Sequence, residues 1–332
     1  MHTYLVGNEY EDIAASWDWN LIPGITVDYG ATELNCSYAN TTGVEQFVGG
    51  ASDGSVGLGV MRFTNPLTKS LHWQKAWFFL PDDVQHVMIS DISSTSNAPV
   101  LSVLDQRLHN GLIFVDGTTY GATESLNTTI SNARKVWHGG VGYVIDDPEF
   151  LTLSLEVGPK TGNWSAIGTS TQPPYTMDLY AAWLEHQDLF QPVAYTAFPG
   201  TALDEFQRKA YSSQLEIICN DDQISAVYDS NNKIAMAVFW QPFGGTITFT
   251  PCEGWASITI LADSNIAIIY RVDTGSITVA DPSQTLDTVE LVFIVSPIGW
   301  SSPNWGSGLV ETITIALPNG GQAGSSVTRN IW

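Results

Sequence analysis

Apolar and polar positions alternate in short stretches along almost the whole chain, the pattern of strands that bury one face. Residues 56–63, 151–157 and 288–296 are examples, each rich in β-branched and aromatic side chains and bounded by Gly, Asn, Asp or Pro. Many short strands at close spacing are typical of β-sandwiches. The pattern therefore predicts an all-β protein.

One stretch departs from this alternation. Leu203, Phe206 and Ala210 fall on one face of a helix, and two acidic residues lie where the N-terminal end of its dipole would favour them. Thr201 stands where a capping hydroxyl is expected. We predict a short helix over roughly residues 202–212.

Clusters of Gly and Pro interrupt the strand pattern at residues 241–245 and 251–254. A chain of 332 residues is also too long for one small core. We therefore predict a large antiparallel β-sandwich over residues 1–245, followed by a smaller C-terminal β-sandwich over residues 246–332.

Composition and charge narrow the classes of partner. The chain is 44% hydrophobic and only 14% charged, which indicates a folded protein. Its 34 acidic and 12 basic residues give a formal net charge of −22, which disfavours nucleic acid and anionic membranes. The same charge argues against an extended cleft for a polyanion and favours a neutral glycan, although it equally fits acidity that only maintains solubility.

The sequence contains no signal peptide and no stretch apolar enough to span a bilayer. We expect a cytoplasmic, a non-classically secreted or a mature extracellular protein. Calcium is an open option, because three adjacent acid pairs could supply oxygen ligands, but none has EF-hand spacing and solvated turns are the favoured interpretation. These pairs are Asp82-Asp83, Asp146-Asp147 and Asp221-Asp222.

Several motifs occur in a recognisable order. The first are GNEYEDI at residues 7–13 and WDW at 17–19, and later ones are KAWFF at 75–79, WHGG at 137–140 and TGNW at 161–164. Together they resemble the β-sandwich half of polysaccharide lyase family 8, the hyaluronate, chondroitin and xanthan lyases. Nine or so such motifs in the right order support the fold more strongly than the activity.

The resemblance implies which part of such an enzyme carries the catalytic groups. In that family an α-helical toroid precedes the β half and carries most of the groups for β-elimination at a uronate. Because Met1 lies almost on the first motif, we expect this chain to lack the toroid, and no catalytic residue can be carried over. Some members are thought to add an acidic residue at the junction; Glu9 lies near it, but the sequence alone does not assign it that role.

Aromatic residues provide the candidate sugar contacts. The loop at 299–306 is the most lectin-like, while the segments around Trp137 and Trp164 are expected in Gly-rich loops, where a purely structural turn is equally favoured. The rings of Trp17 and Trp19 would share one face, with core packing the favoured interpretation. The candidate carbohydrate-binding residues are Trp17, Asp18, Trp19, Trp137, His138, Asn163, Trp164, Trp300, Asn304 and Trp305.

These observations favour a non-catalytic, lectin-like protein that binds neutral glycans through aromatic loops. We expect a homo-oligomer, formed through the face that would otherwise dock the toroid. One alternative is a subunit or fragment of a polysaccharide lyase acting by β-elimination on a uronate-containing polysaccharide. Another is a structural or storage protein without a specific ligand.

Overall fold

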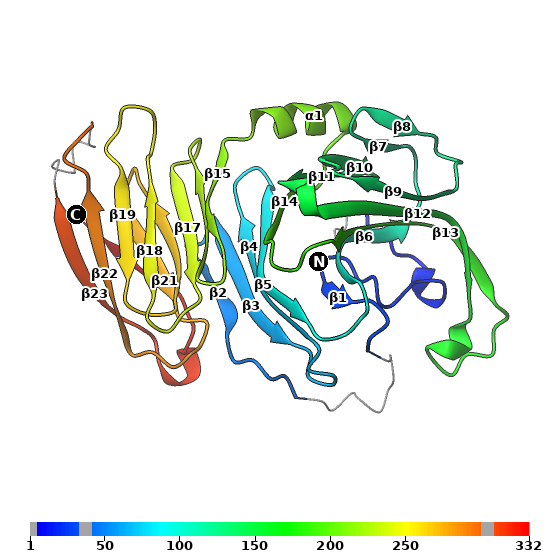
Figure 1. Cartoon of the computed structure of the whole chain (residues 1–332), viewed down its shortest axis with the longest axis horizontal. Coiled ribbons are helices and arrows are strands. Elements are labelled where there is room, and N and C mark those ends of the chain that lie inside the picture. Colours follow the sequence, from blue (N-terminus) through cyan, green and yellow to red (C-terminus); the bar gives the residue numbers. More distant parts are fainter. Residues whose placement is uncertain (1–4, 33–41, 300–308, 332) are drawn as a thin grey trace.

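Four antiparallel β-sheets lie side by side in the computed structural model, which describes residues 5–32, 42–299 and 309–331 (Figure 1). Their order along the molecule is a five-stranded, a nine-stranded, a six-stranded and a four-stranded sheet. The described residues hold a single α-helix, α1 (Leu203–Ser212). The prediction of an all-β protein, with a large sandwich followed by a smaller one, is confirmed.

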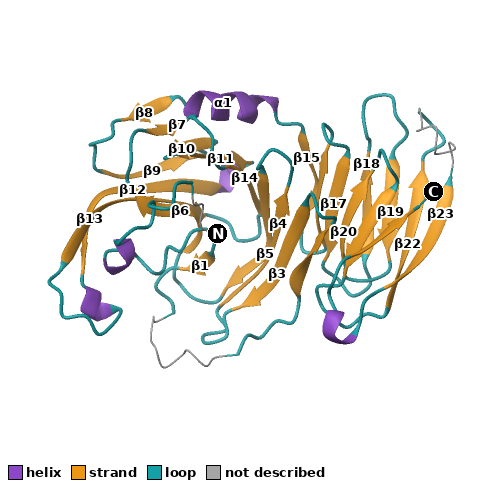
Figure 2. Ribbon diagram, turned by 180° about the vertical axis from the view of Figure 1, so that it is seen from behind, coloured by secondary structure: helices purple, strands orange, loops and turns teal. Residues whose placement is uncertain are grey.

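The first two sheets enclose a hydrophobic core between them. The five-stranded sheet has the order β1 (Thr26–Asp28), β6 (Val100–Leu108), β13 (Tyr175–His186), β12 (Leu151–Gly162) and β9 (Leu126–Ser131). The nine-stranded sheet has the order β2 (Val48–Ser52), β3 (Gly57–Thr64), β4 (Leu71–Phe79), β5 (Gln85–Ser94), β14 (Val193–Phe198), β11 (Val141–Asp146), β10 (Lys135–His138), β7 (Ile113–Val115) and β8 (Thr118–Tyr120). Figure 2 shows β12 and β13 running past the rest of their sheet to the short 3-10 helix η4 (Trp164–Ala166).

The other two sheets form the C-terminal sandwich. The six-stranded sheet has the order β15 (Leu215–Asn220), β16 (Ile224–Asp229), β17 (Ile234–Phe239), β20 (Ala267–Arg271), β21 (Ser276–Ala280) and β24 (Val327–Asn330). The four-stranded sheet has the order β18 (Gly245–Phe249), β19 (Ile258–Ala262), β22 (Thr288–Val295) and β23 (Val310–Ala316). The six-stranded sheet takes strands from both sides of residue 245. The predicted division into domains at residue 245 stays a prediction.

The sheets stack because their inner strands are apolar on both faces. Successive residues of a strand point to opposite sides. On β17, Met236 packs in the core shared with the nine-stranded sheet, and Ala237 packs in the core shared with the four-stranded sheet. All six residues of β17 are buried, as expected of a strand covered on both faces.

Helix α1 covers one end of the nine-stranded sheet (Figure 1). The Phe206 side chain is fully buried and its ring lies 5.8 Å from that of Phe198. The predicted helix is confirmed, but the predicted cap is wrong. Ala202 occupies the N-cap position, and the Thr201 hydroxyl donates instead to the Pro199 carbonyl at 3.0 Å.

None of the helices in the described ranges is long and apolar enough to cross a membrane.

Candidate functional site

A cleft of about 430 Å³ lies where the segment 5–9 crosses the end of β6. It is lined from that segment and from residues 107–110, with Gly139 and Asp178 completing the wall. Its volume falls within the roughly 300–1,000 Å³ common for small-molecule sites. The buried side chains of Arg107 and His109 line this cleft, which makes it the candidate site.

Glu9 shapes one wall of the cleft. Its carboxylate accepts the backbone N–H groups of Leu5 and Val6, both at 2.8 Å, and of Gly7 at 2.9 Å. Slight burial would raise the pKa of Glu9, but these hydrogen bonds outweigh it and hold the pKa below its ordinary value. Glu9 is therefore ionised at neutral pH and fixes segment 5–9 as a turn.

The opposite wall comes from strand β6 and the residue after it. Asp105, Arg107 and His109 are spaced by two, so they lie on the same face. Arg107 and Asp105 are each 1% exposed, with Arg107 Nε 2.6 Å from Asp105 Oδ2. Burial opposes the charge on Arg107, but Asp105 outweighs it and raises the pKa of Arg107 above its ordinary value. Arg107 is thus a buried, permanently charged group.

His109 is oriented by a carboxylate. Its Nδ1 lies 3.0 Å from Asp178 Oδ2, on β13 of the same sheet. The His109 side chain is 1% exposed, whereas the Asp178 side chain is 53% exposed. This contact holds the imidazole in place from the solvent side. The second ring nitrogen, Nε2, therefore points inward.

His138 supports the cleft from behind. Its ring lies 5.3 Å from that of His109 and 4.2 Å from that of Tyr180. The Asn110 N–H donates to His138 Nε2 at 3.3 Å. Burial lowers the pKa of His138 to about 4, so this imidazole is neutral at pH 7.

The expected loop around Trp137 and His138 is wrong. Both residues lie on strand β10, and only the two glycines that follow form the turn to β11. Trp137 Nε1 donates to the Thr201 carbonyl at 2.7 Å, which ties this strand to the start of α1. His138 is 2% exposed. Both side chains therefore pack inside the structure.

The WDW segment lies next to β6 on its other face. The rings of Trp17 and Trp19 are 5.4 Å apart, and Trp19 is 37% exposed. Asp18 is committed to the protein, since its Oδ2 accepts the Tyr29 hydroxyl at 2.6 Å and its Oδ1 accepts the Asn20 N–H at 2.9 Å. Its amide N–H in turn donates to Gln106 at 2.9 Å.

The remaining predicted sugar contacts lie elsewhere. Asn163 caps η4 by accepting the Ser165 N–H at 3.0 Å, and Trp164 begins that 3-10 helix at the far end of β12. Trp300, Asn304 and Trp305 lie outside the described residues. The structure therefore does not gather the predicted residues into one site, and their role in carbohydrate binding stays a prediction.

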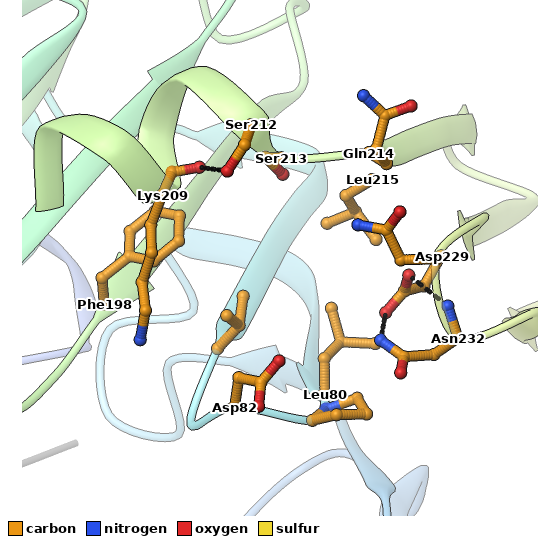
Figure 3. A pocket seen from close by; sticks show the side chains of 13 residues that line it. Leu80, Asp82, Phe198, Lys209, Ser212, Ser213, Gln214, Leu215, Asp229 and Asn232 are labelled. Carbon is orange, nitrogen blue, oxygen red and sulfur yellow. Dashed lines mark hydrogen bonds between the residues drawn. The ribbon is translucent and has the colours of Figure 1, made fainter. Parts of the chain in front are cut away.

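A smaller hollow of about 130 Å³ lies between α1 and the turns after β4 and β16 (Figure 3). Its Asp229 already accepts two hydrogen bonds from Asn232, at 3.0 and 2.8 Å. Its Lys209 lies 3.4 Å from Glu205 on the same helix. These charged groups are satisfied internally, so this hollow is a weaker candidate than the cleft.

Within residues 5–32, 42–299 and 309–331, no three His, Cys, Asp or Glu side chains are placed to hold a metal ion.

Sequence reasoning missed Arg107, His109 and Asp178. The signal was present in part, because charged or titratable residues recur at every second position, 105, 107 and 109, at the end of a buried strand. Asp178 carried no such signal, since it lies 69 residues from His109 and meets it only through strand pairing.

Comparison with known proteins assigns the fold to a family. Residues 1–210 match the model for the polysaccharide lyase family 8 super-sandwich domain, and residues 216–290 match that for its C-terminal β-sandwich domain. Chondroitinase-AC of Pedobacter heparinus is 29% identical over 298 residues, which cover 86% of this chain and 40% of the relative. Hyaluronate lyase HylB of Enterococcus faecalis is 26% identical, covering 81% of this chain and 28% of the relative.

Solved structures of polysaccharide lyases match the fold of this chain. A chondroitinase AC lyase studied in oligosaccharide complexes matches with a TM-score of 0.82 and 25% identity, over 97% of this chain and 45% of that one. A Paenibacillus xanthan lyase matches in fold with a TM-score of 0.80 at 19% identity, over 97% of this chain and 31% of that one. The chain thus spans less than half the length of the proteins it matches.

The expectation of a non-catalytic, lectin-like protein is wrong. The relatives that match most of this chain are polysaccharide lyases, and the match extends through both sandwiches. Among the residues that suggested a lectin, Trp137 lies on strand β10 and Asn163 caps η4.

Proposed function

The chain belongs to polysaccharide lyase family 8, and from this premise we propose that it is the β-sheet part of a lyase that cleaves a uronate-containing polysaccharide by β-elimination. The observation that carries the proposal is the 29% identity to chondroitinase-AC over 86% of the chain. The proposal makes the chain a subunit or fragment of an enzyme, since it covers 40% of that relative.

In β-elimination, a base removes the proton on the carbon next to the carboxylate, the bond to the glycosidic oxygen breaks, and that oxygen takes up a proton. A carbon–carbon double bond remains in the product. The resemblance places the groups that move protons in the toroid. We infer that this chain contributes the opposing wall, with Glu9 fixing segment 5–9 and β6 presenting its buried charges.

The charge of the chain bears on its ligand. A net charge of −22 disfavours a polyanion unless local positive charge compensates it. Arg107 provides such a charge inside the cleft. We propose an acidic polysaccharide as the substrate in place of the neutral glycan expected earlier, while the expected homo-oligomer remains a prediction.

The test exchanges β halves between enzymes. This chain is fused to the part of chondroitinase-AC that its match does not cover, and the chimera is offered hyaluronan, chondroitin, xanthan and a neutral glucan. The proposal predicts ultraviolet absorbance from an unsaturated product with at least one acidic polymer and none with the glucan. A folded chimera that forms no unsaturated product from any polymer would refute it.

A further inference from the structure

The cleft contains buried polar atoms that the protein does not use. Among the described residues, Nη1 and Nη2 of Arg107 and Nε2 of His109 are buried and have no hydrogen-bond partner. Both side chains line the cleft and both are at least nine-tenths buried. Buried donors without partners are costly, most of all on a charged group, and each needs an explanation such as a ligand.

The unused donors suit an anion with two oxygens. The guanidinium is planar and presents its N–H groups as a fork that matches a carboxylate. Asp105 approaches only the Nε atom of Arg107, so both terminal nitrogens remain for a ligand. His109 stands two residues further on the same face and can supply a third contact.

The other acids of the cleft are already compensated. Three backbone N–H groups hydrogen-bond the Glu9 carboxylate, and His109 hydrogen-bonds that of Asp178. They lie beside the cleft and would repel a second negative group. The cleft therefore fits a ligand with one carboxylate better than a densely charged one.

The remaining walls suit a sugar ring. Leu5 and Leu108 offer apolar surface, while Asn8 and Asn110 offer amide donors and acceptors. Apolar walls with a few placed polar groups are typical of sites that bind small organic ligands. A ring with hydroxyls and a single carboxylate has this chemistry.

We propose that Arg107 and His109 form a carboxylate subsite for one acidic sugar residue, in the cleft between segment 5–9 and the end of β6. The assignment rests on the proposed function, because the sugar would be a uronate of the polysaccharide. Arg107 would bind the carboxylate through Nη1 and Nη2. His109 Nε2 would accept a hydrogen bond from a hydroxyl of the same sugar, because Nδ1 carries the proton that faces Asp178.

The experiment measures binding by the whole chain and needs no turnover. Glucuronate is titrated into protein with 15N-labelled histidine, and the His109 Nε2 resonance is followed. Glucose provides the same ring without the carboxylate, and acetate provides the carboxylate without the ring. We expect saturable shifts with glucuronate, none with glucose, and weaker binding of acetate.

Variants locate the subsite. Arg107→Gln should weaken glucuronate binding on the order of 10- to 100-fold, because it removes a charge-assisted pair of hydrogen bonds. The matched control is Arg134→Gln, at an exposed arginine outside this cleft, which should bind glucuronate like the unaltered chain. Because Arg107→Gln leaves Asp105 buried and unpaired, the double variant Asp105→Asn/Arg107→Gln repeats the test without that charge. His109→Gln tests the imidazole contact alone.

Several results would overturn the proposal. These are equal binding of glucose and glucuronate, equal binding of acetate and glucuronate, or unchanged affinity in folded Arg107 and His109 variants. The results distinguish a failure of glucuronate binding from a failure of elimination by the chimera. Glucuronate binding that depends on Arg107, with no elimination by the chimera, would refute the proposed function and leave the subsite standing as a uronate site. Elimination without such binding would refute only the subsite.

Discussion

Lys75 of β4 has its amino group buried between the five- and nine-stranded sheets. Its Nζ donates to Thr26 Oγ1 at 2.6 Å and to the Gly24 carbonyl at 3.2 Å, and the rings of Trp73 and Trp77 lie 5.0 and 5.7 Å away. In the described part of the chain it forms no ion pair with a carboxylate. Burial lowers the pKa of Lys75 from 10.5 to about 7.

The sign of the resulting pH dependence follows from proton binding. Between pH 7 and 10.5 the unfolded chain binds a proton at Lys75 that the folded chain does not. Lys75 therefore does not destabilise the folded chain above pH 10.5. As the pH falls from 10.5 towards 7, the free energy of unfolding decreases by about 1.4 kcal/mol per pH unit. At pH 7 the charged form costs the folded state about 4 kcal/mol.

Lys75→Met keeps the apolar stem and removes the charge. The variant also loses two hydrogen bonds, worth about 1 kcal/mol each, so we expect a net gain of roughly 2 kcal/mol in the free energy of unfolding at pH 7. Urea unfolding at several pH values measures this. The advantage of the variant over the unaltered chain should shrink by about 3 kcal/mol between about pH 6.5 and 9.5.

The control is Lys135→Met, at a lysine of β10 that is not fully buried. It should show little pH dependence of this kind. A Lys75→Met variant that is several kcal/mol less stable at about pH 6.5, or whose difference from the unaltered chain is the same at every pH, would refute the reasoning.

Three further predictions concern individual contacts. Arg271→Ala removes an ion pair of 2.6 Å with Asp53 and should lower the free energy of unfolding by about 1–2 kcal/mol at neutral pH. Burial would raise the pKa of Asp53, but Arg271 and backbone N–H groups hold it below 3.8, so the effect should persist above that pH and fade in urea titrations as the pH falls through the lowered pKa. Gly162→Ala would place a Cβ 1.5 Å from the Ala15 carbonyl oxygen and should lower the thermal midpoint, with a cost of about 1–3 kcal/mol; an unchanged midpoint would contradict the packing. Glu9→Gln should speed amide hydrogen exchange in residues 5–7 several-fold, because a neutral amide with one acceptor oxygen replaces a carboxylate that holds three N–H groups; unchanged exchange would show that the turn forms without the charge.

The hydrophobic pattern determines much of the fold. The fully apolar run of β17 indicates a strand covered on both faces, and the amphipathic spacing around Phe206 predicts α1 within a residue of its observed bounds. Local signals were less reliable at the ends of elements. The Thr201 hydroxyl was free to bond the Pro199 carbonyl, and the strand β10 continued up to the glycines that the sequence suggested as a loop.

The cleft was harder to predict, because its parts meet only after folding. His109 gains its partner Asp178 through the pairing of β6 with β13, and segment 5–9 reaches β6 through the backbone contact of Leu108 N–H with the Glu9 carbonyl at 2.9 Å. The charged residues of β6 were missed at the level of the sequence. Their partners could not be read from spacing along the chain.

The most direct test of the account is the initial rate of elimination by the chimera compared with the same chondroitinase-AC part alone, on one acidic polysaccharide and at equal concentration. If this chain is the β part of a family 8 lyase, the chimera forms unsaturated product steadily and faster than that part alone. A folded chimera with no more activity than the part alone would contradict the central claim.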